Sequence, residues 1–490
     1  MIAALLLVPT LTGLLCFALR ADSGRRAVLL LAALVHAGLT VTTWWQLPAP
    51  MLNDWLQLDA PGRVFLTITS VLFLAAAVYS LGYLRQETHV TRTDIEEGFL
   101  FANAPEATFT GCLLLFLAAM TLVTCSHRFG LLWVAIEMTT LVSAPLIYFH
   151  RHHRSLEAAW KYLMICSVGI ALALLGNFFL AVAATNPGGE PIPLVLGDLV
   201  REAAHLHPTW LKAAFLLLLV GYGTKMGLAP LHTWLPDAHS EAPSVVSALL
   251  SGALLNCAFL GILRAQQVCS AAGQAAFGQD LLVGFGLLSI AVAAIFIVGQ
   301  SDYKRMLAYS SVEHMGILSL GVGLGGAATF GSLLHAVNHS LTKAMLFLAA
   351  GNILTVYRSK STTEVRGVLH VLPTSGALWI VGFLAITGSP PFGLFLSELT
   401  IVKAAIDQGR VGVVAAFLTL LMAIFIGMAA VVLRMAQGTP PDRPQPLTSQ
   451  SESLLSTLPA AALAGIVLLL GLYLPPFLTQ ALETAAQALR

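Results

Sequence analysis

Apolar runs of about twenty residues recur along this sequence from one end to the other. As helices, such runs are long enough to cross the hydrocarbon core of a bilayer. Of the 490 residues, 57% are hydrophobic and only 10% are charged. Because a helix satisfies its own backbone hydrogen bonds in lipid, the pattern predicts an all-α polytopic membrane protein and excludes a soluble fold.

The runs predict about fourteen membrane spans. The first, Met1–Leu19, has no basic residue before its apolar stretch, so we expect it to be retained and not cleaved as a secretory signal. The expected spans begin near Ile2, Ala27, Val64, Phe109, Phe129, Trp160, Leu211, Pro243, Leu281, Leu307, Ala328, Thr374, Val411 and Leu454.

Two spans are interrupted by Gly and Pro: residues 221–236 (GYGTKMGLAPLHTWLP) and 387–399 (TGSPPFGLFLSEL). A matched pair of broken helices indicates an inverted-repeat transporter whose breaks line an aqueous path. We therefore expect two inverted five-helix repeats. The chain divides into an N-terminal three-helix segment (1–107), a first repeat (108–265), a second repeat (281–434), and a loop with a C-terminal helix (435–490).

Cationic residues are distributed unequally between alternate loops. One set of loops carries fourteen of the 25 Lys and Arg residues and the other carries eight. Since cytoplasmic loops are enriched in Lys and Arg, both termini are predicted to lie on the non-cytoplasmic side of a bacterial inner membrane.

Nucleic acid binding is excluded because no basic run is longer than Arg25-Arg26. The six cysteines have no CxxC spacing, so neither a metal nor an iron–sulfur cofactor is expected in this chain.

Ionisable residues inside the apolar runs are the candidate functional residues, because each costs at least about 2.5 kcal/mol to insert. Glu137 lies near the middle of the fifth span, and Lys225 precedes the break at Pro230. A Glu–Lys pair that separates and re-forms makes a switchable proton site. The alternatives are a structural carboxyl paired across helices and a lysine that snorkels to the interface.

His335, His339 and Lys343 recur every four residues and so form one stripe on the eleventh span. Imidazole both donates and accepts protons, so the stripe is typical of a proton wire, whereas a single buried His is more often structural. Glu398 follows the second break. It is predicted to act either as a gate at the end of the proton path or as one partner of an ion pair that stabilises the broken helix.

A second group of residues is assigned to proton uptake or coupling: His232, Asp237, His239, Glu313, His314 and Lys161. The spacing of His232, Asp237 and His239 matches no standard zinc pattern, which favours a hydrogen-bonded loop over a metal site. Lys161 is either part of the proton wire or an anchor at the membrane interface.

Four segments resemble the proton-translocating antiporter-like subunits of respiratory complex I, Mrp-type Na⁺/H⁺ antiporters and membrane-bound hydrogenases. They are KMGLAPLHTWLPDAHSEAPS (225–244), SDYKRMLAYSSVEHMGI (301–317), HAVNHSLTKAMLFLAAGN (335–352) and the span of Glu137. Residues 136–149 (IEMTTLVSAPLIYF) and 156–177 are most similar to the component F subunits of hydrogenase-4 and formate hydrogenlyase systems.

The resemblance implies that Glu137 and Lys225 form an input pair and that Glu398 is the output residue. Many relatives have a lysine at the position of Asn256, and Asn does not take up a proton near neutral pH. The middle step is therefore assigned to His335, His339 and Lys343.

We therefore expect this chain to be a proton-pumping subunit of a redox-driven complex, with no enzyme activity of its own. NiFe and iron–sulfur centres are expected in partner subunits: other membrane subunits and a soluble hydrogenase or dehydrogenase arm. The alternatives are a subunit of an Mrp-type Na⁺/H⁺ antiporter, the membrane subunit of an inorganic-carbon uptake complex, and a structural spacer that conducts nothing.

Overall fold

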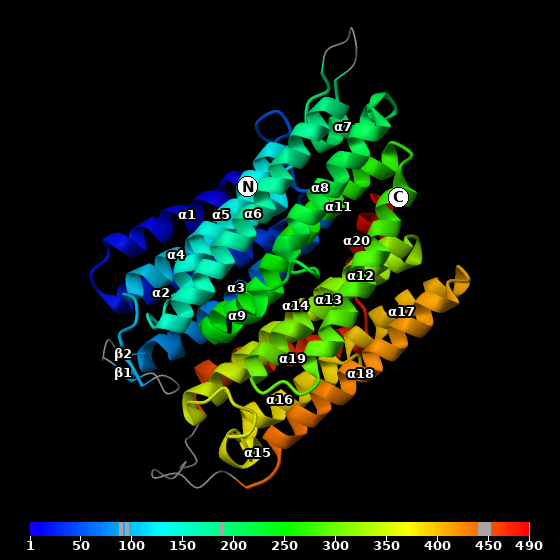
Figure 1. Ribbon diagram of the computed structural model, residues 1–490. Coiled ribbons are helices and arrows are strands. Elements are labelled where there is room, and N and C mark those ends of the chain that lie inside the picture. The colour runs from blue at the N-terminus through cyan, green and yellow to red at the C-terminus, as the bar shows by residue number, and fades with distance from the viewer. Residues whose placement is uncertain (88–91, 94–97, 186–190, 440–451, 490) are drawn as a thin grey trace.

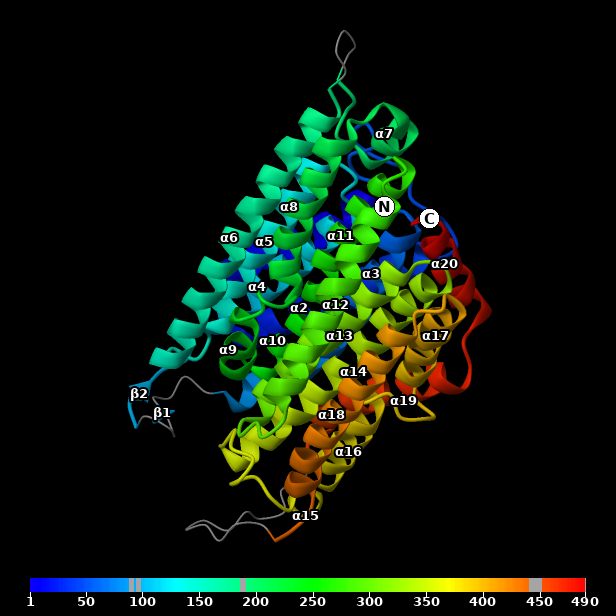
Figure 2. The same cartoon turned by 45° about the vertical axis from the view of Figure 1, so that its right-hand side comes forward.

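The chain folds into one bundle of roughly parallel helices in a computed structural model that describes all residues except 88–91, 94–97, 186–190, 440–451 and 490 (Figure 1). In both views the two termini lie at the same end of the bundle as helix α7 (Leu196–Arg201) (Figures 1 and 2). Helix α15 (Val368–Val371) lies at the opposite end, together with the short hairpin of β1 (Arg92–Thr93) and β2 (Leu100–Phe101). We call these the α7 end and the α15 end.

The first half of the chain contributes the helices α1 (Ile2–Ala18), α2 (Asp22–Thr42), α3 (Ala60–Gln86), α4 (Glu106–Cys125), α5 (Phe129–Ile147), α6 (His153–Ala183), η1 (Ala203–His205), α8 (Pro208–Met226), α9 (Trp234–Glu241), α10 (Ser244–Leu249), η2 (Leu250–Leu254) and α11 (Leu255–Ala271). The second half contributes α12 (Ala275–Ile297), α13 (Tyr303–Leu324), α14 (Ala327–Tyr357), α16 (Pro373–Ile386), α17 (Gly393–Asp407), α18 (Val411–Ala436), α19 (Leu454–Leu472) and α20 (Pro476–Gln487).

Ten helical segments of the described chain are long and apolar enough to cross a membrane, and α1 and α16 are shorter apolar helices. The prediction of an all-α polytopic membrane protein is therefore confirmed. Three further helices, α8, α13 and α17, are not among these ten segments. Each of the three carries ionisable residues of the candidate site. The loops that begin after α5 and α14 contain Arg151 and Arg358 and lie at the α15 end, so this end carries loops of the cation-rich set.

Both predicted breaks exist, but each is shorter than the sequence suggested. Helix α8 continues to Met226 and ends at Gly227, whose φ of 86° lies in the left-handed region that glycine adopts without strain. The second break runs from Thr387 to Phe392. The breaks are short because a proline removes a hydrogen bond only from its own helical turn, and the flanking turns stay helical.

Glycines bring α6 and α8 into close contact. A Cβ at Gly221 would lie 2.6 Å from the backbone N of Ala173, and one at Gly169 would lie 2.6 Å from the Cβ of Thr224. Small residues therefore allow the end of α8 to approach α6, and this approach positions Lys225 beside Tyr162 of α6.

The last predicted span covers the second break. A Cβ at Gly471 of α19 would lie 1.9 Å from the carbonyl O of Pro391 and 2.6 Å from the carbonyl C of Phe392. Only glycine fits this contact, so the C-terminal part of α19 rests directly on the backbone of the break.

A buried arginine joins three segments near the α7 end. Arg264 of α11 is 2% exposed, and its Nη2 donates to the carbonyl O of Thr124 at 3.0 Å and contacts Asp59 Oδ1 at 3.5 Å. Asp59 caps α3 through Gly62 N at 2.9 Å, and His127 Nε2 lies 3.5 Å from its Oδ2. Burial alone would raise the pKa of Asp59, but the charge of Arg264 and the contact with His127 outweigh it and lower the pKa to about 2.

Asp59→Asn is expected to destabilise the protein by about 2 kcal/mol, because Arg264 loses the charge that offsets its burial. A carboxylate whose pKa is lowered on folding contributes stability above its unfolded pKa of about 3.9, and this contribution is lost as the pH falls toward about 2. Thermal unfolding of the purified protein at pH 7 and at pH 3 measures both effects. Asp198→Asn is the control, since Asp198 pairs with Arg201 on a more exposed surface. An equal loss of stability in both variants would contradict the prediction.

Candidate functional site

Glu137 and Lys225 lie on either side of one threonine. The Thr140 hydroxyl donates to Glu137 Oε2 at 3.1 Å, and Lys225 Nζ donates to Thr140 Oγ1 at 2.8 Å. Ser167 of α6 donates to the other carboxylate oxygen, Oε1, at 3.1 Å. No direct ion pair joins Glu137 to Lys225 in the described chain, so a hydroxyl connects the two groups.

The groups that contact Lys225 directly are neutral hydroxyls and aromatic rings. Lys225 is fully buried, and its Nζ donates to the Tyr162 hydroxyl at 2.6 Å and lies 4.4 Å from the centre of the Tyr162 ring. Tyr162 in turn shares a 2.7 Å hydrogen bond with Ser143 and packs against Trp234, the first residue of α9. An ammonium group held by hydroxyls and ring faces is able to lose its proton without leaving a carboxylate unpaired.

The stripe His335, His339 and Lys343 lies on α14, and all three side chains are fully buried. Lys343 Nζ donates to the carbonyl O of Leu307 in α13 at 2.6 Å. Glu313, one turn and a half further along α13, is 3% exposed, and its Oε2 has no hydrogen-bond partner among the described residues. The middle of the bundle thus contains a buried ammonium, a buried carboxyl and imidazoles.

Two histidines of neighbouring helices are hydrogen-bonded to each other. His314 Nδ1 lies 2.8 Å from His335 Nε2, and His335 Nδ1 lies 2.9 Å from the Ser397 hydroxyl of α17. The His339 ring lies 5.0 Å from the His314 ring. These contacts connect α13, α14 and α17 through groups that both donate and accept protons.

Glu398 follows directly on Ser397 and is 9% exposed. One of its oxygens and one ring nitrogen each of His314 and His335 all lie within 4.8 Å of one another. A Cβ at Gly388 would lie 2.1 Å from Glu398 Oε2, so the glycine of the second break leaves the space that the carboxylate occupies. The break therefore brings Glu398 to the end of the histidine contacts.

Donor type alone would allow His314, His335 and Glu398 to hold a divalent metal. His335, however, uses both ring nitrogens in hydrogen bonds, Nε2 with His314 Nδ1 at 2.8 Å and Nδ1 with the Ser397 hydroxyl at 2.9 Å, so it has no nitrogen left for a metal. The arrangement fits a shared proton better than a metal ion.

His239 of α9 packs against α14. Its imidazole is fully buried, stacks on Phe347 of α14 at 5.1 Å, and has no hydrogen-bond partner on either nitrogen among the described residues. His232 lies beside the first break, 7% exposed, with its ring 6.1 Å from that of Tyr309.

Lys161 and Asp237 lie apart from the buried row, in an ion-pair network near the α15 end. Asp237 of α9 accepts from Lys161 at 2.9 Å and from Arg305 at 2.6 Å, and Lys161 also pairs with Glu157 at 2.7 Å. Lys161 is 45% exposed, so of its two predicted roles the geometry favours the anchor. The network ties the broken helix to α6 and α13.

Asn256 donates to the carbonyl O of Gly252 at 2.9 Å and to the Ser340 hydroxyl at 2.7 Å. Its amide connects α11 to α14 next to the π-helical turn η2, which the sequence did not predict.

Sequence reasoning missed Tyr162 and Ser397, which contact Lys225 and His335. Both lie in apolar runs, where a tyrosine or serine is indistinguishable from a packing residue. A sequence signal for both residues was their position next to an ionisable residue. Ser397 immediately precedes Glu398, and Tyr162 immediately follows Lys161.

The fold and these side chains together define a polytopic membrane protein with a row of buried ionisable groups that ends at two broken helices. Residues 126–427 match the membrane family described as NADH:quinone oxidoreductase/Mrp antiporter, and the chain belongs to this family. It is 37% identical to a hydrogenase-4 component F homolog of Methylacidiphilum infernorum, over 86% of each chain. It is 29% identical to hydrogenase-4 component B of Escherichia coli, over 78% of this chain and 55% of that relative.

Solved structures share the fold. A chain of the Mrp complex from Dietzia sp. superimposes with a TM-score of 0.86 at 20% identity, covering 100% of this chain and 97% of that one. A chain of respiratory complex I from Thermus thermophilus gives 0.81 at 21% identity and covers both chains completely.

Proposed function

We propose that this chain is a proton-translocating membrane subunit of a redox-driven complex of the hydrogenase or NADH dehydrogenase type. The observation that carries the proposal is the connection Glu137–Thr140–Lys225 in one half of the chain and His339–His314–His335–Glu398 in the other. Lys343 lies on the same face of α14 as His335 and His339. Buried ionisable groups in a membrane are costly and need a function.

Protons would move along this row by a change of charge at one end. When Lys225 loses its positive charge, Lys343 no longer experiences repulsion from that side and holds a proton more readily. The shift passes to the histidines and to Glu398, which releases its proton at the second break. The two breaks supply the aqueous ends of the row, as unwound backbone does in inverted-repeat transporters.

The finer architecture belongs to the same proposal. It includes fourteen spans, two inverted repeats at residues 108–265 and 281–434, and both termini on the non-cytoplasmic side of a bacterial inner membrane. The α15 end, with cation-rich loops, would then face the cytoplasm. The partners would be other membrane subunits and a soluble arm that carries NiFe and iron–sulfur centres.

Purification of the native complex, with its subunits identified by mass spectrometry, tests the assembly. Reconstituted into vesicles, the complex should acidify or alkalinise the lumen only while its electron donor is oxidised, and a protonophore should abolish the signal. Sodium-driven proton exchange without any electron donor would instead favour a subunit of an Na⁺/H⁺ antiporter, the alternative that the similarity to an Mrp chain supports.

Tyr162→Phe is expected to slow proton translocation by about threefold to tenfold, since it removes one charge-assisted hydrogen bond of Lys225 while leaving the ring in place. Proton flux divided by electron flux in the same vesicles is the measurement. Tyr222→Phe is a matched control: Tyr222 is also fully buried on the face of α8 near α11, and its hydroxyl has no hydrogen-bond partner among the described residues. Equal effects in both variants would count against a role for the Tyr162 hydroxyl.

A further inference from the structure

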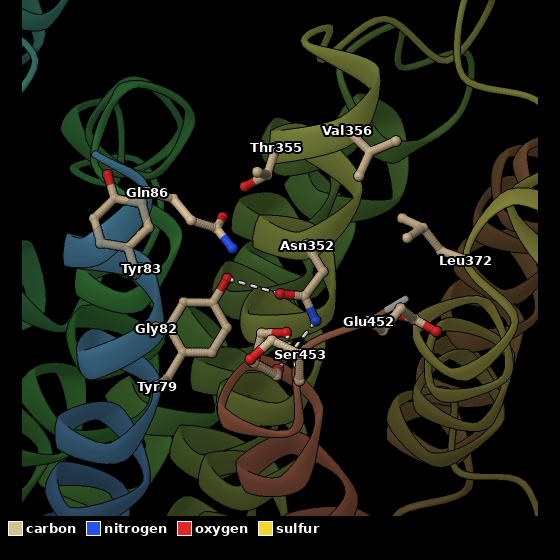
Figure 3. A pocket seen from close by; sticks show the side chains of 11 residues that line it. Tyr79, Gly82, Tyr83, Gln86, Asn352, Thr355, Val356, Leu372, Glu452 and Ser453 are labelled. Atoms are coloured by element: carbon tan, nitrogen blue, oxygen red, sulfur yellow. Dashed lines mark hydrogen bonds between the residues drawn. The ribbon is translucent and has the colours of Figure 1, made fainter. Parts of the chain in front are cut away.

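A single side-chain amide joins the start of α19 to three other helices near the α15 end. Asn352 of α14 accepts a hydrogen bond from the Tyr79 hydroxyl of α3 at 3.0 Å, as Figure 3 shows. Its Nδ2 donates to the carbonyl O of Ser456 in α19 and to the Ser375 hydroxyl of α16, both at 3.0 Å. Asn352 is 8% exposed, so little solvent competes for these bonds. The start of α19 is therefore fixed relative to α3, α14 and α16.

A carboxylate adds a second connection at the same place. Glu452, just before α19, accepts from the backbone N of Thr374 at 2.7 Å and of Ser375 at 2.9 Å, and also from the Ser375 hydroxyl. Thr374 and Ser375 belong to the first turn of α16, whose N–H groups have no carbonyl partner within the helix. The carboxylate also lies at the positive end of the helix dipole. Helices α16 and α19 thus begin side by side.

The other end of α19 lies against the second break. Gly471 is about 26 Å along the helix from Leu454, at 1.5 Å per residue. A Cβ at Gly471 would lie 1.9 Å from the carbonyl O of Pro391. It would also lie 2.6 Å from the carbonyl C of Phe392 and 2.7 Å from the backbone N of Gly393. Since α17 begins at Gly393, α19 contacts the break at the point where α17 starts.

Helix α14 contacts the same turn of α17. A Cβ at Gly393 would lie 2.1 Å from Asn338 Oδ1. Asn338 is fully buried, and its Oδ1 has no hydrogen-bond partner among the described residues. The first turn of α17 is therefore in close contact with α14 through Asn338 and with α19 through Gly471, and neither contact leaves room for a further methyl group.

Ser397 and Glu398 lie in the next turn of α17. The Ser397 hydroxyl is 2.9 Å from His335 Nδ1, and a Glu398 oxygen lies within 4.8 Å of a ring nitrogen of His335. Because α17 is one continuous helix from Gly393 to Asp407, a displacement of its first turn would move both side chains relative to the imidazole. Proton transfer needs heavy atoms at hydrogen-bond distance, so a shift of about 1 Å would slow it.

We propose that α19 is a positioning helix for the end of the row. Its contact at Gly471 holds the first turn of α17 against α14. Ser397 and Glu398 are thereby kept beside His335. Gly471 is a positioning residue, because it touches the backbone of the break and none of the ionisable side chains. The proposal rests on the proposed function, since it states how the last proton-transfer residues are held in place.

The test compares one substitution at two positions of the same helix. Gly471→Ala adds a Cβ at the contact, so α19 or the start of α17 must move, whereas a Cβ at Gly465 meets nothing within 4 Å. Neither glycine has a positive φ, so alanine fits the backbone at both positions. In reconstituted complexes, Gly471→Ala should lower the number of protons moved per electron by about threefold to tenfold, and Gly465→Ala should leave it unchanged.

A double variant shows whether Gly471 acts through Glu398. If it does, Gly471→Ala combined with Glu398→Gln moves protons no more slowly than Glu398→Gln alone, because the carboxyl that Gly471 positions is already absent. A general loss of structure would instead multiply the two effects. That result would overturn the proposal, as would normal proton flux in an assembled Gly471→Ala complex. Absence of redox-driven proton flux in the wild-type complex would refute the proposed function instead.

If Gly471→Ala fails to assemble, Glu452→Ala replaces it, because it removes a connection at the start of α19 and adds no atom near the break. The number of protons moved per electron should fall by about twofold or more, with no additional loss in the Glu398→Gln background. Glu364→Ala, an exposed position between α14 and α15, is the matched control. Equal flux in the Glu452→Ala and Glu364→Ala complexes would overturn the proposal.

Discussion

Lys225→Met should reduce redox-driven proton translocation by about a hundredfold or more while the complex still assembles. Met keeps the length and apolar stem of the side chain, but it loses the group that donates to Thr140 at 2.8 Å and to Tyr162 at 2.6 Å. The proton flux per electron in reconstituted vesicles is the decisive measurement, because a failure confined to the partner subunits would change the electron flux as well.

Lys225→Arg separates a proton-transfer role from a purely electrostatic one. Arginine keeps the positive charge but does not release a proton at any working pH, so it should be as inactive as Met. If Arg restored translocation, Lys225 would act only as a fixed charge. Lys212→Met, on the same helix near the α7 end, controls for loss of a lysine from α8 and should leave the flux unchanged.

Glu398→Gln is expected to lower proton translocation by about tenfold to a hundredfold. The amide has nearly the shape of the carboxyl, so it fits the space beside Gly388 and the contacts with His314 and His335, but it takes up no proton. Stopped-flow measurement of proton release on the lumen side of the vesicles should show the slow step at this residue.

Two variants control the Glu398 experiment. Glu398→Asp retains an ionisable group and should recover part of the rate, whereas Glu483→Gln, an exposed position on α20, should have no effect. A Glu398→Gln complex with normal proton release would remove Glu398 from the row and leave it as a structural residue of the second break.

The sequence predicted the membrane class from length and hydrophobicity, because both are one-dimensional properties of the chain. It also predicted that His335, His339 and Lys343 share one helix face, since a spacing of four residues fixes their direction. It did not predict that Lys225 bonds to Thr140, or that Ser397 and His314 bond to His335, because these contacts join different helices. Lys161 and Lys225 both lie in apolar runs, yet the packing of α8 against α5 and α6 buries Lys225, whereas Lys161 stays 45% exposed.

The contact between Gly471 and the second break has a consequence for the synthesis of the protein. A ribosome completes Thr387–Phe392 roughly eighty residues before it reaches Gly471, so the break enters the bilayer before the helix that covers it exists. During this interval the carbonyl of Pro391 has no covering segment from α19. Premature termination after α18 but before Gly471 would therefore produce a protein with every ionisable residue of the row but with the second break uncovered.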